Sequence, residues 1–438
     1  MRAAVITVVL LPLVVFGVRL WSEPPFDARR DAIMFRGALD SSRSVALRTD
    51  FASFYYAGKA SSRGLDIYNE RVLDSLATAD GVMNHVLPYL YPPIVAVFAQ
   101  PLSYAAPASA QWLWDAAQLA FIAGTGVILL LTHLSAWPAV EVRTRHVTGA
   151  IVVCAALLVF PFWQNLLFGQ INTLVLLLMS GFFFLLRNSA RDWSAGVALA
   201  LATLVKVTPA MLVLPVFLEK RWKVLGGFAV GLVALVVVST AVAGIQPWRM
   251  FLDFLSNMGY ARTVAGGFHP SIPANLSLAG FFMRLLPGQA ATIRLLTIGG
   301  VLLLLTAVLV FQLTQQNTTA DAFLLLAYLT VMVVASPVTW LHHLIYLVPG
   351  VVFVLRELLA QKNGGVRRWG IVSIALLVFG VSVDFQRKSS FISMSETWRA
   401  FLTSMNLWFL LLMFVAALTL HRLNAKTTRR GVSFHNIP

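Results

Sequence analysis

The stretch from Thr49 to Asn69, TDFASFYYAGKASSRGLDIYN, places the carboxylate of Asp50 at the start of a short aromatic helix. Phe51 and Tyr55 fall on one face at helical spacing, which suits a helix lying in a membrane interface. A carboxylate at a helix start is well held to take a proton from a hydroxyl, but Asp is also a favoured N-cap. The two roles are compatible, and we expect Tyr56 on the same helix to contact a substrate.

Two adjacent histidines, His342 and His343, open an apolar segment in the sequence SPVTWLHH. Neighbouring helical side chains point about 100° apart, so the two rings rarely bind one metal together. No other cluster of His, Asp or Glu supplies further ligands, and we expect neither a metal nor a cofactor. One imidazole is expected to orient a base or to bind a phosphate or sugar hydroxyl, with Trp340 as a substrate contact. A histidine bonded only to backbone is the alternative.

Lys206 lies in the middle of an apolar stretch, LATLVKVTPAMLVL. A lysine at membrane depth pairs with an anion or reaches the interface. A lipid phosphate is the expected partner, and snorkelling to the head groups is the alternative. The following Thr208 and Pro209 can open the helix backbone, so a re-entrant hairpin is possible here.

Polar and aromatic side chains also mark two junctions between apolar segments. Gln170 and Asn172 lie in GQIN, where their amides can bind sugar hydroxyls or close helix ends. Tyr91 lies in YLYPP, a proline-stiffened approach to a span, and either contacts a substrate or belongs to an aromatic belt.

A Gly-, Pro- and aromatic-rich segment, residues 245–290, contributes three more candidates. Asn275 offers a polar contact to a substrate. Arg262 and His269 can meet a phosphate or simply face solvent.

Composition assigns the chain to the multi-spanning helical membrane proteins. Of 438 residues, 58% are hydrophobic and 12% are charged, and the mean hydropathy is +0.79. Apolar runs of span length recur along the chain, so we predict a single all-α domain over residues 1–438 with about 11–13 transmembrane helices. The candidate spans are 3–21, 92–106, 108–134, 147–161, 172–187, 193–218, 222–244, 291–312, 320–336, 337–355, 367–384 and 398–420.

The net charge of +15 is concentrated in short loops and in the tail, 421–438. This distribution is typical of cytoplasmic loops, with anionic lipid contact as a second interpretation, and no nucleic-acid module is visible. Two long segments, 22–90 and 245–290, then face the other side, and we expect interfacial helices in the first. The one cysteine, Cys154, excludes an internal disulfide.

In their order along the chain, several motifs resemble glycosyltransferase family 87, the bacterial polyprenyl-phosphate-mannose-dependent mannosyltransferases of the GT-C class. They are DFASFYYAGKASSRGLDIYN, YLYPPIVAVFAQPL, FGQINTLVLLL, LVKVTPAMLVLPVFLEKRWK, NLSLAGFFMRL and SPVTWLHHLIYLVPG. The resemblance covers most of residues 50–350.

The resemblance implies a GT-C fold in the bacterial inner membrane with its active site facing the periplasm. It implies a polyprenyl-phosphate hexose donor, usually mannose, and a lipid-linked or cell-envelope glycan acceptor. Asp50 maps onto the general base, and His342 or His343 is expected near it. Lys206, Arg262 or His269 can then hold the leaving phosphate in an inverting transfer. A transporter or flippase of a lipid-linked sugar and a non-catalytic assembly factor are the alternatives.

Overall fold

The computed structural model describes residues 1–22, 45–82, 85–134, 142–157, 159–257, 259–260, 270–315, 321–361, 363–383 and 395–432. Throughout these ranges the regular structure is helical, apart from an isolated parallel bridge between Val45 and Val82. The predicted all-α, multi-spanning architecture is therefore confirmed.

Seven helical segments of the described chain are long and apolar enough to cross a membrane, fewer than the 11–13 predicted. An eighth is added if α7 (Val142–Leu157) and α8 (Phe160–Phe168), bent by 52°, form one span. The seven are α1 (Arg2–Ser22), α6 (Pro107–Leu134), α12 (Trp222–Ala243), α15 (Ala290–Gln315), η4 (Leu341–Leu347) with α17 (Val348–Ala360), α18 (Gly364–Ser382) and α20 (Met405–Val432).

Several predicted spans that are not among the seven fall on shorter apolar helices of the described chain. The predicted span 92–106 is α5 (Pro93–Ala99) followed by η1 (Gln100–Tyr104). The spans at 172–187 and 320–336 are α9 (Asn172–Leu186) and α16 (Ala322–Val334), and every residue of α16 is buried. Length, not burial, separates these helices from the seven, since the span Leu341–Ala360 is itself mostly buried.

The break at Lys206 forms a re-entrant hairpin. Helix α10 (Asp192–Val205) ends at Lys206, and η3 (Thr208–Leu212) and α11 (Val213–Leu218) lead back. After this return, Arg221 forms an ion pair with Asp192 at the start of α10 and donates to the Leu186 carbonyl. The segment thus enters and leaves at one end of the bundle, and its tip reaches about 20 Å inward at 1.5 Å per residue.

Close helix packing fixes α10, the first arm of this hairpin. Gly196 of α10 and Gly227 of α12 face each other so tightly that a Cβ on either would overlap the backbone of the other helix. Small residues allow such backbone contact between membrane helices. The position of Lys206 at the end of α10 is therefore set by a rigid helix pair.

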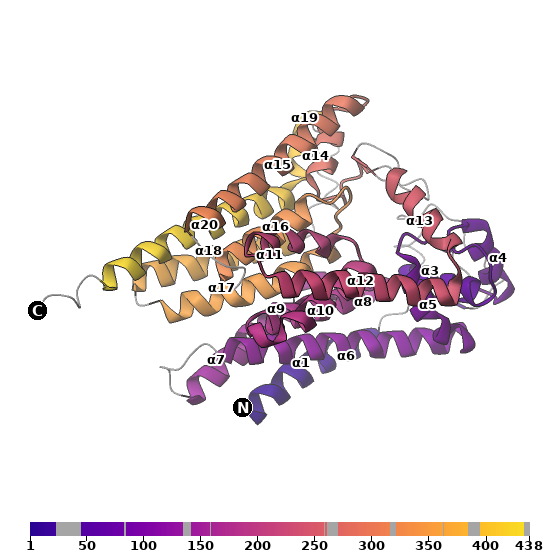
Figure 1. Cartoon of the computed structure of the whole chain (residues 1–438), viewed down its shortest axis with the longest axis horizontal. Coiled ribbons are helices and arrows are strands. Elements are labelled where there is room, and N and C mark those ends of the chain that lie inside the picture. Colours follow the sequence, from indigo (N-terminus) through magenta and orange to yellow (C-terminus); the bar gives the residue numbers. More distant parts are fainter. Residues whose placement is uncertain are drawn as a thin grey trace, which may run out of the picture.

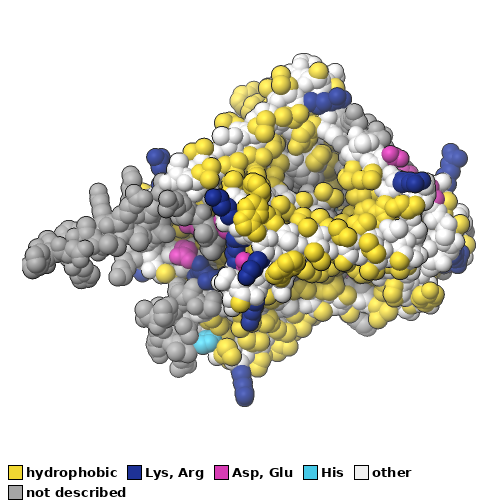
Figure 2. Space-filling view, in the orientation of Figure 1, with side chains coloured by type: hydrophobic (Ala, Val, Ile, Leu, Met, Phe, Trp, Pro, Cys, Tyr) yellow, Lys and Arg dark blue, Asp and Glu magenta, His cyan; other side chains and the backbone are white. Residues whose placement is uncertain are grey.

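Figure 1 shows α3 (Thr49–Ser62), α4 (Glu70–Ala79), α5 and α13 (Gln246–Asn257) gathered at the end of the bundle opposite the C-terminus. The remaining short helices are η2 (Ser189–Arg191), α14 (Leu278–Leu285) and α19 (Glu396–Leu402). Apolar side chains cover α12 and α15 in the view of Figure 2, as expected for helices that face lipid.

Helix α3 differs from the interfacial helix predicted for the first long segment. Eleven of its residues are buried, and it packs against α4, α5, α6 and α8. Its aromatic rings are therefore covered by protein, whereas α4 keeps the half-exposed, amphipathic character expected of an interfacial helix. Asp50 lies in the first turn of α3, and Arg48, not Asp50, occupies the N-cap position.

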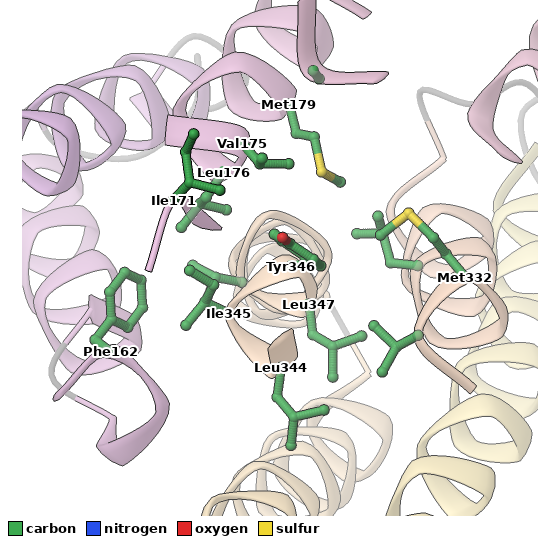
Figure 3. Packing of buried hydrophobic residues seen from close by; sticks show 14 of the residues in the cluster. Phe162, Ile171, Val175, Leu176, Met179, Met332, Leu344, Ile345, Tyr346 and Leu347 are labelled. Carbon is green, nitrogen blue, oxygen red and sulfur yellow. The ribbon is translucent and has the colours of Figure 1, made fainter. Parts of the chain in front are cut away.

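The interior of the bundle is built around η4. Figure 3 shows Ile345, Tyr346 and Leu347 directed among apolar side chains of α8, α9 and α16. These helices contact η4 along its length. The histidine-bearing start of η4 is thereby held deep in the protein.

Candidate active site

A buried ion pair anchors the start of α3. Arg48 is 1% exposed and Asp115 of α6 is 2% exposed, and the Arg48 Nε lies 3.1 Å from both carboxylate oxygens of Asp115. The Arg48 Nη1 also donates to the Leu167 carbonyl, and its backbone N–H donates to Gln111. Two residues later, the half-buried Asp50 is thus held on a start of α3 that is fixed to α6 and α8.

The turn between α8 and α9 packs onto the same helix start. Gly169 adopts φ +70°, a conformation that favours glycine, and a Cβ there would lie 2.7 Å from the Phe51 Cβ. The Gly169 carbonyl accepts a hydrogen bond of 2.8 Å from the Trp114 indole. This close approach places the first residues of α9 next to the Asp50 turn.

Lys206, at the tip of the hairpin, is the centre of a polar cluster. Its Nζ donates to the Asn172 Oδ1 at 2.7 Å and lies 2.8 Å from the His343 Nε2. Tyr346 also donates to the Asn172 Oδ1, and the Asn172 Nδ2 donates to Asn165 at 2.9 Å. Residues from α8, α9, η4 and the hairpin therefore meet in one cluster around the Lys206 side chain.

The two adjacent histidines have different surroundings. His343 faces Lys206, and its Nδ1 accepts the Trp340 backbone N–H at 3.2 Å. His342 is buried against the Phe168 ring, and its Nε2 has no hydrogen-bond partner within the described part of the chain. The geometry therefore brings His343, not His342, into direct contact with the lysine.

The negative charge of Asp50 acts on Lys206 and Tyr91, which both lie outside the long spans. Burial lowers the pKa of Lys206 to about 7, and Asp50 opposes this shift. Burial raises the pKa of Tyr91 well above its ordinary value, and Asp50 adds to that shift. Tyr91 also donates to the Gln170 Oε1 at 3.1 Å, and its ring contacts Phe54. Asp50, Tyr91, Gln170 and Lys206 thus belong to one neighbourhood.

This neighbourhood combines a carboxylate, a lysine and several hydrogen-bond donors. A carboxylate can accept the proton of an attacking hydroxyl, and a cation with nearby donors can stabilise a departing phosphate. Among the described residues, no group of three or more His, Cys, Asp or Glu side chains is arranged to hold a metal ion.

The family model of glycosyltransferase family 87 matches residues 89–337, which is more than half of the chain. The chain belongs to glycosyltransferase family 87. The matched range includes Tyr91, Gln170, Asn172 and Lys206, whereas Asp50 and both histidines lie outside it. The family model therefore does not test the roles expected for Asp50, His342 and His343. These roles depend on where the three residues lie relative to the matched residues in the fold.

Curated relatives of this family 87 chain come from mycobacteria and corynebacteria. A polyprenol-phosphate-mannose-dependent alpha-(1-2)-phosphatidylinositol mannoside mannosyltransferase of Mycobacterium tuberculosis is 26% identical over 287 residues, covering 63% of this chain and 64% of that protein. The corresponding protein of Mycolicibacterium smegmatis is 25% identical, covering 74% and 72%. An alpha-(1->3)-arabinofuranosyltransferase of Corynebacterium glutamicum is 27% identical, covering 46% and 44%. The matched region thus spans just under two thirds of the first relative.

Tyr56 and Asn275, which were also predicted for the site, make hydrogen bonds to residues outside the Lys206 cluster. The Tyr56 hydroxyl donates to Asp80, on a part of α3 tied to the end of α4. Asn275 is fully buried, and its amide bonds the Pro270 and Pro337 carbonyls and the Thr339 N–H, which gives it a structural role. Trp340 precedes η4 as its N-cap residue, its side chain is half-buried, and its backbone N–H donates to the His343 Nδ1. Arg262 and His269 lie outside the described residues.

Sequence inspection missed three residues of this region: Arg48, Asp115 and Tyr346. A signal was present for Asp115, because an acidic residue inside an apolar span needs a buried partner. Arg48 precedes Asp50 by two residues, and its role becomes clear only from its contact with α6. Tyr346 follows His343 by one turn and resembles an ordinary aromatic residue of a span.

Proposed function

We propose that the protein is an inverting glycosyltransferase that moves a hexose, mannose in the first instance, from a polyprenyl-phosphate donor to a lipid-linked or cell-envelope glycan. The observation that carries this proposal is the cluster of Lys206, Asn172 and His343 within the electrostatic influence of Asp50. The relatives that use polyprenol-phosphate-mannose support the donor class.

In this mechanism the donor phosphate lies at Lys206, with Asn172 and Tyr91 beside it. The acceptor hydroxyl attacks the anomeric carbon from the opposite face, and Asp50 takes its proton. The bond between the anomeric carbon and the phosphate oxygen breaks as the new glycosidic bond forms. A single displacement inverts the anomeric centre, so one carboxylate base is sufficient.

The inner membrane of a bacterium is the proposed location, with the α3 end of the bundle facing the periplasm. Arg187 and Arg221 lie together at the opposite end, because Arg221 donates to the carbonyl that precedes Arg187. The charge of Arg356 also acts on Arg187. A cluster of basic residues at one end supports a cytoplasmic location for that end.

The test measures sugar transfer by the purified chain from synthetic polyprenyl-phosphate mannose to a panel of glycolipid acceptors. Asp50→Asn should lower turnover by about 100-fold or more, which is the usual contribution of a general base. Glu70→Gln is the matched control, because Glu70 also lies in the first turn of a helix but is exposed. If Asp50→Asn turned over as fast as the wild type, Asp50 would not be the general base.

Parallel assays with polyprenyl-phosphate donors carrying glucose or arabinofuranose show which sugar the protein transfers. Arabinofuranose is included because an arabinofuranosyltransferase is among the relatives. If the wild type transfers none of these sugars but moves a lipid-linked sugar across vesicles, the transporter alternative replaces the enzyme.

A further inference from the structure

Both ring nitrogens of His343 are engaged. The Nδ1 accepts the Trp340 backbone N–H, which is the bond that a side chain in the third position of a helix makes back to the N-cap residue. The Nε2 lies 2.8 Å from the Lys206 Nζ. A neutral imidazole carries one proton, and a nitrogen that accepts an N–H cannot carry it. The proton of neutral His343 is therefore on Nε2 and is directed at Lys206.

An N–H directed at Lys206 requires a lone pair on the lysine nitrogen, which only a neutral amine has. The remaining contacts fit a neutral amine. Lys206 has a good acceptor in the Asn172 Oδ1 at 2.7 Å. The orientation of that amide is fixed, since Asn172 Nδ2 donates to Asn165 and Tyr346 donates to the same Oδ1.

We propose that Lys206 and His343 form a neutral amine–imidazole pair, and that binding of a lipid phosphate brings one proton from solvent onto Lys206. The inference rests on the proposed function, since it assigns the phosphate of the donor to this lysine. The new ammonium turns from the His343 N–H toward the phosphate oxygens, and the histidine keeps its tautomer.

Some of the groups that face Lys206 favour its ammonium form and others favour its neutral amine form. Asp50 on α3 is the nearby negative charge and favours the ammonium. The buried surroundings favour the amine, and so does the N–H of His343. The other titratable neighbours are His342 and the phenols of Tyr91 and Tyr346, whose rings lie 5.9 and 6.0 Å from the Nζ. The lowered pKa of Lys206 is consistent with this balance. A bound phosphate anion adds a second negative charge beside Lys206 and shifts the protonation equilibrium of the lysine toward the ammonium.

The proton has a use in the transfer step. The donor phosphodiester carries one negative charge, and the phosphate monoester that leaves gains a second as its bond to the sugar breaks. The acceptor proton goes to Asp50, so the leaving group is not neutralised by that route. An ammonium at Lys206 stabilises the growing charge where it develops, which lowers the barrier more than it favours substrate binding.

The test is calorimetry of farnesyl methyl phosphate binding to the full chain in detergent, at about pH 8, in buffers with small and large ionisation enthalpies. This phosphodiester carries one fixed charge and does not itself titrate. The wild type should take up about one proton for each ligand bound. Lys206→Arg should bind with no uptake, because a guanidinium is already protonated. His343→Ala should take up less than the wild type, because the amine loses its N–H donor.

Equal heats in the two buffers for the wild type would refute the shared-proton pair, and so would wild-type uptake by Lys206→Arg. No binding by the wild type would refute the phosphate site at Lys206. The proposed function fails separately. Sugar transfer without proton uptake contradicts only the pair, whereas proton uptake without any sugar transfer contradicts only the enzymatic function.

Discussion

Breaking the Arg48–Asp115 pair tests whether the buried charges position Asp50 or only stabilise the fold. The single variant Asp115→Leu leaves the Arg48 guanidinium buried without its carboxylate. The double variant, Arg48→Met with Asp115→Leu, removes both charges and keeps most of the side-chain volume. Comparing the two separates the cost of an unpaired charge from the loss of a fixed helix start.

The expected magnitudes follow from burial and geometry. Both charged side chains are at most 3% exposed, so removing one partner should cost about 3–5 kcal/mol of unfolding free energy. The double variant should recover most of this, because a buried pair replaced by apolar residues is often close to neutral. A remainder of about 1–3 kcal/mol is expected, since Gln111 donates to Asp115 and would lose an acceptor.

Turnover should not recover with stability. In the double variant, the side-chain bonds from Arg48 to α6 and to the Leu167 carbonyl are absent, so the first turn of α3 can shift. A displacement of about 1 Å at a reacting group can cost about 100-fold in rate, and we expect a loss of this order in kcat. Thermal unfolding in detergent and mannose transfer, measured on the same preparations, give the two quantities.

The reasoning is refuted if the double variant regains both wild-type stability and wild-type kcat, because the pair would then only stabilise the fold. Wild-type stability in Asp115→Leu would show that Arg48 does not depend on this carboxylate. Asp192→Asn is a suitable control, because it breaks a partly buried ion pair with Arg221 at the other end of the bundle.

Two further predictions concern the same region. Gly169→Ala should lower the thermal midpoint and turnover together. A residue other than glycine in a left-handed backbone conformation costs about 1–2 kcal/mol, and the added Cβ would press on Phe51. Unchanged values in both assays would contradict the packing of this turn on α3. The wild-type kcat/KM for the donor should fall as pH rises above about 7, because the lowered pKa of Lys206 means that the amine loses its proton there. Lys206→Arg should remove this alkaline decline in a pH profile, and an identical decline in the variant would assign it to another group.

The sequence identified the membrane class and several residues of the candidate site for physical reasons. Lys206 and Asp50 are charged residues next to apolar segments, where a charge requires a specific partner or water. The hairpin at Lys206 was also detectable, because Pro209 interrupts the helix. Each of these signals is local, and so is readable without knowing the fold.

The contacts between these residues are not local and were not predictable. Whether Lys206 meets His342 or His343 depends on how η4 is rotated against α9, and this rotation follows from the packing of the whole bundle. The burial of α3 was missed because aromatic residues suit a protein interior as well as a membrane interface. Fewer long helices are described than spans were predicted, because α9 and α16 are shorter than the apolar runs that contain them.

The re-entrant hairpin has a consequence for how the chain is inserted into the membrane. A segment that returns to its own side makes no net crossing, so its complete removal, from Asp192 to Arg221, leaves every later helix in its original orientation. The presence or absence of the hairpin therefore does not change the orientation of the C-terminal helices, although the proposed phosphate site needs its tip, which carries Lys206.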